Sequence, residues 1–92
     1  MEYVFIQRPG DREAVAAIVK EFEKLSKSQL VDQYNRMVQI GIVGVHAQAL
    51  RIVALHNVFN RVFGISPIGV EDNVLIKLLG EIELRGEGWL YK

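Results

Sequence analysis

The 92-residue sequence contains no cysteine and no threonine, and both absences restrict its chemistry. Without cysteine the chain can form neither a disulfide nor a thiolate metal site, which fits a reducing compartment. Only Ser26, Ser28 and Ser66 remain as aliphatic hydroxyl nucleophiles, and a nucleophile also needs a base beside it. The sequence therefore predicts no nucleophilic catalytic residue.

Histidine is also scarce, since His46 and His56 are the only two. Ten residues apart on a helix, they would stand about 15 Å from each other, too far to share a metal ion or a proton. We interpret them as polar positions on a mostly buried helix rather than as catalytic or ligating groups. We expect no metal site and no cofactor.

Two pairs of acidic residues are candidates for acid–base chemistry, namely Glu71 with Asp72 and Glu81 with Glu83. Acidic residues just before a helix cap it and interact favourably with the helix dipole. Acidic residues at alternate positions are expected on the solvent-exposed face of a strand. An acid pair in a glycosidase also needs a cleft, which a small domain can rarely build. We therefore expect that the protein is not an enzyme.

No aspartate or glutamate lies between Gln33 and Val70, although the chain is neutral overall with 11 basic and 11 acidic residues. The only full charges in this stretch are Arg36, Arg51 and Arg61. The stretch is also the most apolar part of the sequence. Such a segment forms either the buried core of the domain or a surface that a partner covers.

The first residues lack the basic start and the apolar run of a secretory signal, so we expect a cytoplasmic protein. The stretch from Met37 to Leu55 has the length of a membrane span, but it contains Gln39, Gln48 and Arg51. An arginine near the centre of a span costs about 2.5 to 3.5 kcal/mol on insertion scales. We expect no membrane partner.

The chain is long enough for one small domain and half hydrophobic, which predicts a single domain over residues 1–92 with one core. Turn residues and the spacing of apolar residues predict the secondary structure of the first half of the chain. A short strand is predicted from Glu2 to Gln7, before the break at Pro9-Gly10. A helix follows, with Asp11 as its N-cap, and Ser26 opens a second helix through a capping box.

In the second half, the glycines at 41 and 44 predict a bend, and a long helix follows over 45–63 with Gly64 as its left-handed cap. The acids at 71 and 72 and Asn73 predict the start of a short final helix through residue 79, with a strand as the alternative. Residues 81–91 alternate around a glycine turn, which predicts a β-hairpin that could pair with the N-terminal strand.

Together these elements predict an α+β fold that is mainly α. Three or four helices pack round a long central helix at about 45–63. A small antiparallel sheet forms from the N-terminal strand and the C-terminal hairpin.

The segment from Ile40 to His46 invites comparison with a dinucleotide-binding turn. The dinucleotide fingerprint needs three glycines and an acid about twenty residues later, whereas this glycine pattern stops at Gly44 and the next acid is Glu71. Close packing of a neighbouring backbone is the better interpretation. A small-molecule or nucleotide binder therefore ranks third among the functions considered.

The long helix is apolar nearly all round, and a chain this short should leave one of its sides for a second copy or another protein. An apolar centre with a polar rim is a common interface layout. The predicted interface residues are His46, Ala49, Leu50, Val53, Asn57, Asn60 and Arg61. Complete coverage of this side by the protein's own elements is an equal alternative.

We therefore predict a non-catalytic protein-interaction module, a homodimer or a small subunit of an assembly. The alternative is a small winged or bent-helix DNA-binding protein, suggested by the acid-free centre, the glycine bend and the hairpin. Three arginines without a lysine give few phosphate contacts, so nucleic acid is not the favoured partner.

Overall fold

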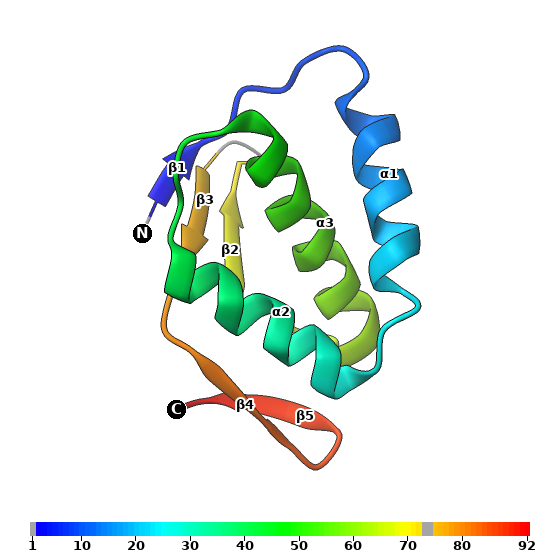
Figure 1. The fold of residues 1–92 in the computed structure, drawn as a ribbon, viewed down its shortest axis with the longest axis vertical. Helices are drawn as coiled ribbons and strands as arrows, with labels where there is room; N and C mark the ends of the chain where they lie inside the picture. The colour runs from blue at the N-terminus through cyan, green and yellow to red at the C-terminus, as the bar shows by residue number, and fades with distance from the viewer. Residues whose placement is uncertain (1, 73–74) are drawn as a thin grey trace.

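The structure is a computed structural model that describes residues 2–72 and 75–92. This part of the chain is a small α+β fold, about half helical, with three helices and two small antiparallel sheets (Figure 1). The helices are α1 (Asp11–Phe22), α2 (Lys27–Ile40) and α3 (His46–Phe63). The strands are β1 (Glu2–Val4), β2 (Ile68–Glu71), β3 (Leu75–Leu78), β4 (Ile82–Arg85) and β5 (Gly88–Tyr91).

The first sheet has the order β1-β3-β2, and both of its pairings are antiparallel. Tyr3, Ile76 and Val70 lie opposite one another in neighbouring strands and face the helices. On the outer face, Lys77 of the central strand forms ion pairs with Glu2 and Glu71 of the two edge strands. The sheet therefore has one apolar face packed on the core and one charged face in solvent.

The short final helix predicted through residue 79 is wrong, because the structure places residues 75–78 in β3. Ile76 and Leu78 are buried, whereas Leu75 and Lys77 are half-buried, which is the two-residue period of a strand. Strands on both sides complete its hydrogen bonds. The predicted capping residue Asn73 and the next residue, Val74, lie outside the described residues.

The predicted pairing between the N-terminal strand and the C-terminal hairpin is also wrong. β1 pairs with β3, and β4 and β5 form a separate two-stranded sheet. The hairpin is held on α2 instead, because the amide of Asn35 bonds both backbone groups of Ile82 at 2.8 Å. The hairpin itself, from 82 to 91, is as predicted.

Three predictions about helix ends are confirmed. The Ser26 side chain accepts from the Gln29 N–H, and Gln29 returns a bond to the Ser26 N–H, which completes the capping box. The chain turns at Gly41 and Gly44, which both have positive φ, and Gly64 ends α3 in the left-handed conformation. Two helix starts differ. Gly10 is the N-cap of α1 and Asp11 its first helical residue, and α3 begins at His46 with Val45 as its N-cap.

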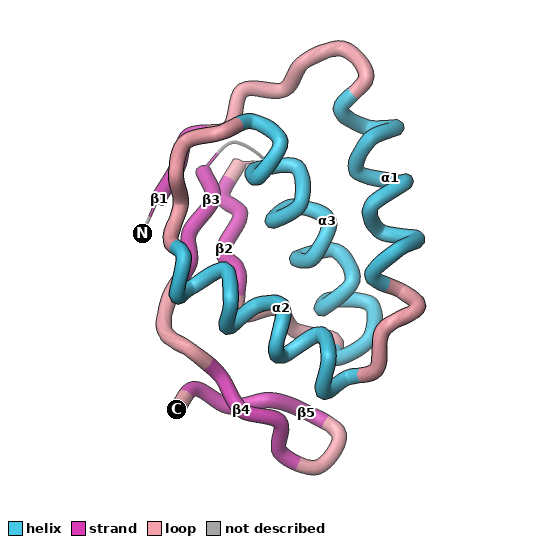
Figure 2. Tube along the Cα trace, in the orientation of Figure 1, coloured by secondary structure: helices cyan, strands magenta, loops and turns pink. Residues whose placement is uncertain are grey.

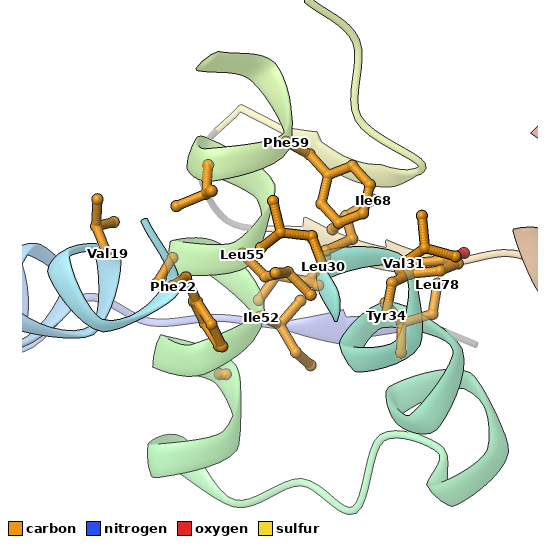
Figure 3. Packing of buried hydrophobic residues seen from close by; sticks show 14 of the residues in the cluster. Val19, Phe22, Leu30, Val31, Tyr34, Ile52, Leu55, Phe59, Ile68 and Leu78 are labelled. Atoms are coloured by element: carbon orange, nitrogen blue, oxygen red, sulfur yellow. The ribbon is translucent and has the colours of Figure 1, made fainter. Parts of the chain in front are cut away.

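The core forms around α3, which packs on the first sheet and on both other helices (Figure 3). The fully buried Leu55 of α3 belongs to one cluster with Phe22 from α1, Leu30 and Tyr34 from α2, and Leu78 from β3. The predicted central helix is therefore seen in part, since α3 contacts α1, α2, β2 and β3 while the hairpin packs mainly on α2. Among the described helices, none is both long and apolar enough to cross a membrane.

Candidate functional site

The residues of the predicted interface do not form one exposed surface. Ala49 is only 2% exposed and belongs to the core, and Leu50 and Val53 are half-buried against it. His46 is half-buried and bonds Asp11, while Asn60 is exposed and bonds the ring of His56. The residues that do share a surface are Val53, Asn57 and Arg61, which line one groove.

This groove runs between α1 and α3 and has a volume of about 730 Å³. The two helices run in broadly the same direction and lie side by side (Figure 1). α1 packs mainly on α3, so part of its apolar face has neither the sheet nor α2 over it. The groove follows that uncovered face.

The α1 wall comes from side chains that recur every four residues. Val15 and Val19 form its apolar floor, and the row of Arg12, Ala16 and Lys20 lies beside them on the exposed side. Residues four apart lie one above the other on a helix, so each set makes a stripe along the axis. The wall therefore offers an apolar strip with a cation at each end of its exposed edge.

The α3 wall is more polar. Val53 continues the apolar floor, and His56, Asn57 and Arg61 follow at spacings of three and four residues. Phe5 and Gln7, from the segment that joins β1 to α1, close one end of the groove. Val70 of the edge strand β2 completes the lining, so the groove also borders the sheet.

The two carboxylates of the groove are already paired. The Nε2 atom of His46 lies 3.0 Å from both oxygens of Asp11, and this hydrogen bond lowers the pKa of the Asp11 carboxyl, as does the bond from the Arg8 N–H. Glu23 accepts from Arg61 at 2.9 Å. Arg12 and Lys20 form no ion pair with any described residue, so the unbalanced charge of the groove is positive.

His56 is the only imidazole that lines the groove, and burial lowers its pKa. Its Nε2 accepts from the Asn60 amide at 3.2 Å, which places the proton of the neutral ring on Nδ1. That Nδ1 is buried without a well-aligned hydrogen-bond partner among the described residues. His56 therefore stands neutral at pH 7, and the cations of the groove are its arginines and Lys20.

The arrangement supports binding better than catalysis. No group of three or more histidine, aspartate or glutamate side chains in the described residues could hold a metal ion. The carboxylates are occupied by His46 and Arg61, and no serine lines the groove. What remains is an apolar strip, two unpaired cations and the edge of a sheet, which are groups that recognise a ligand by contact and charge.

Sequence reasoning missed the α1 half of this site. The apolar positions of α1 indicate a core-facing helix, and nothing in the sequence says that the sheet stops before it covers them. One signal was present, since Arg12, Ala16 and Lys20 lie four residues apart. Val70 gave no signal, because its role depends on β2 being an edge strand.

Comparison of the chain with protein-family models, with curated proteins and with solved structures finds no match. The functional conclusion therefore depends on the geometry of the groove.

Proposed function

We propose that this protein is a non-catalytic protein-interaction module that binds a segment of its partner in the groove between α1 and α3. The observation that carries the proposal is the uncovered apolar strip of α1, which Val53 and Val70 extend across to α3 and the sheet. An apolar surface in a recess with a polar rim is a common layout for binding protein segments. The groove replaces the α3 patch as the proposed contact surface.

The shape of the groove favours a peptide over a compact ligand. Its volume of about 730 Å³ falls within the range of about 300 to 1,000 Å³ typical of small-molecule pockets. The α1 residues that line it, however, extend from Asp11 to Glu23, which is about 18 Å along a helix. A peptide segment of five or six extended residues has about that length.

The DNA-binding alternative has less support. In a bent-helix protein α3 would enter the major groove of DNA, which requires an exposed face. Ile52, Leu55 and Phe59 of α3 are fully buried under α1, α2 and the sheet, and Arg51 and Arg61 pair with Glu21 and Glu23. Those acids would repel phosphates beside each arginine. We therefore do not extend the proposal to nucleic acid.

The proposal can be tested by selecting peptides from a random phage-displayed library against the immobilised protein. The blocking variant is Ala16→Glu, which puts a larger side chain into the groove, and its matched control is Ala17→Glu. Both alanines are exposed on the same turn of α1, but only Ala16 lines the groove. Each substitution adds one carboxylate, so the two variants should fold equally well.

We expect enriched peptides to bind the wild-type protein and Ala17→Glu with similar affinity and to bind Ala16→Glu at least tenfold more weakly. Peptides that bind both variants equally would place the binding site elsewhere on the protein. If no peptide is enriched above background, the interaction function of the groove is contradicted.

A further inference from the structure

The edge of β2 that borders the groove has unpaired backbone groups. The N–H of Ile68 donates to the Ser66 hydroxyl at 3.0 Å, so it points away from β3. Backbone groups of alternate residues in a strand point to the same side. The N–H and C=O of Val70 therefore also point away from β3. Among the described residues, no group outside the sheet bonds to them.

Val70 also lines the groove, so its open backbone edge and the uncovered face of α1 border the same space. In Figure 1, α3 lies between β2 and α1, and β2 runs in the opposite direction to α1. A further strand beside β2 would extend the first sheet beneath α1. It would cover Val15 and Val19 in the same way that the existing strands cover α3.

We propose that the groove binds an extended acidic segment, which adds to β2 as a fourth strand. This inference rests on the proposed interaction function of the groove and names the partner's chemistry. Strand addition supplies main-chain hydrogen bonds, and alternate side chains then supply specificity. Val70 offers one donor and one acceptor, so the side chains facing α1 must carry most of the selectivity.

The spacing of charges on α1 indicates which side chains fit. Arg12 and Lys20 lie eight residues apart on the helix, or about 12 Å, with Ala16 midway between them. Residues four apart in a strand are separated by about 13 Å and face the same side. A strand with an acid, a small apolar residue and an acid at every second position therefore matches Arg12, Ala16 and Lys20.

The charges already in the groove agree with this partner. Asp11 and Glu23 would repel an acidic segment, but Asp11 is buried and hydrogen-bonded to His46, and Glu23 is paired with Arg61. Arg12 and Lys20 remain unpaired among the described residues. Two attractive ion pairs at the rim act mainly on specificity and on the association rate. A basic segment would be repelled by the same two cations, and both acids of the groove already have partners.

The test uses the synthetic peptide Thr-Glu-Thr-Val-Thr-Glu-Thr with blocked ends, in which threonine favours the extended form. One comparison peptide has lysine in place of both glutamates. Another has the same side chains with alternate backbone nitrogens methylated, which removes the donors that a new strand needs. Binding is followed by heteronuclear NMR and by hydrogen exchange of the Val70 amide.

We expect the glutamate peptide to bind at least tenfold more tightly than the lysine peptide and the methylated peptide. It should slow exchange of the Val70 amide at least tenfold. The double variant Arg12→Gln and Lys20→Gln should lose most of the preference for glutamate. The control is Lys24→Gln, at a residue beyond the end of α1 and outside the groove. This variant should keep the preference for the glutamate peptide.

Equal binding of the methylated peptide, without protection of Val70, would overturn strand addition and leave the groove as a binding site for another conformation. Failure of the glutamate peptide, while library peptides still depend on Ala16, would overturn the acidic segment but not the proposed function. The proposed function itself fails only if the library also yields no groove-dependent peptide. The two experiments therefore separate the two conclusions.

Discussion

At the residue scale, Tyr34 shows how one polar atom is accommodated in this core. The ring is fully buried against Phe59, and the hydroxyl donates to the Gly80 carbonyl at 2.9 Å. Burial raises the pKa of Tyr34 to about 12, with a smaller contribution from Tyr91. The phenol is therefore neutral in the folded state at pH values where an exposed tyrosine would ionise.

Replacing Tyr34 with phenylalanine should lower the free energy of unfolding by about 1 kcal/mol at neutral pH, because a buried hydrogen bond is lost. Between pH 10 and 12 the unfolded wild-type chain releases the Tyr34 proton before the folded chain does, so wild-type stability falls as pH rises. Tyr34→Phe should lose less stability over this window. Urea denaturation at several pH values measures both effects.

The control is Tyr3→Phe, because the Tyr3 hydroxyl has no hydrogen bond among the described residues. It should change stability at neutral pH by less than about 0.5 kcal/mol. If Tyr34→Phe and the wild type have the same pH dependence from 10 to 12, the Tyr34 phenol is not the group responsible.

At the element scale, the C-terminal hairpin depends on one asparagine of α2. The Asn35 amide donates to the Ile82 carbonyl and accepts from the Ile82 N–H, as the backbone of a neighbouring strand would. Both Asn35 and Ile82 are buried. Farther along the hairpin, Lys27 pairs with the exposed Glu87, an interaction that solvent weakens.

We predict that Asn35→Ala lowers the free energy of unfolding by about 2 to 4 kcal/mol, because it leaves a buried donor and a buried acceptor without partners. Hydrogen exchange at the Ile82 amide should accelerate more than exchange in α3, since the hairpin detaches first. Gln33→Ala is the control, because Gln33 is on the same helix and its side chain has no hydrogen bond among the described residues. Equal destabilisation by both variants would mean that the two Asn35–Ile82 hydrogen bonds are not what holds the hairpin on α2.

At the scale of the whole molecule, a second surface is a candidate for self-association. Val4, Ile6, Val43 and Val45 are each more than half exposed. The segments that carry them are adjacent, because Phe5 stacks on His46 and a Cβ at Gly44 would lie 3.9 Å from the Tyr3 ring. Figure 2 shows the connection between α2 and α3 running beside β1. We call these four residues the aliphatic patch.

We predict that the protein dimerises through the aliphatic patch and that Val45→Asp weakens the dimer at least tenfold. Val45 is the N-cap of α3, has extended backbone angles and makes no capping bond. Aspartate there should cap the helix and stabilise the monomer by about 0.5 to 2 kcal/mol. Analytical ultracentrifugation measures the association, and thermal unfolding at low concentration measures the stability.

Leu79→Asp is the control, because Leu79 is an exposed aliphatic residue outside the patch. It should leave the dimer intact. A wild-type protein that stays monomeric at high concentration would contradict self-association, and equal weakening by both variants would place the dimer contact elsewhere.

Most of the helical architecture could be predicted from the sequence, because the signals that set it are local. The capping box at Ser26, the positive φ of Gly64 and the helical spacing on α1 act within a few residues of the chain. The hairpin was predictable for the same reason, since alternation and a glycine turn specify it. Of the predicted interface, Val53, Asn57 and Arg61 line the groove, whereas Ala49 lies in the core.

The sequence by itself thus determined where α2 begins, where α3 ends, where the chain bends and that its C-terminal residues form a hairpin. Only the tertiary structure decided that residues 75–78 form a strand, because a short apolar run fits a helix or a strand equally well until β1 and β2 supply its partners. It also decided that the sheet ends at β2 and leaves part of α1 uncovered. The groove depends on which elements pack together over long separations in sequence, and local patterns carry no information about that.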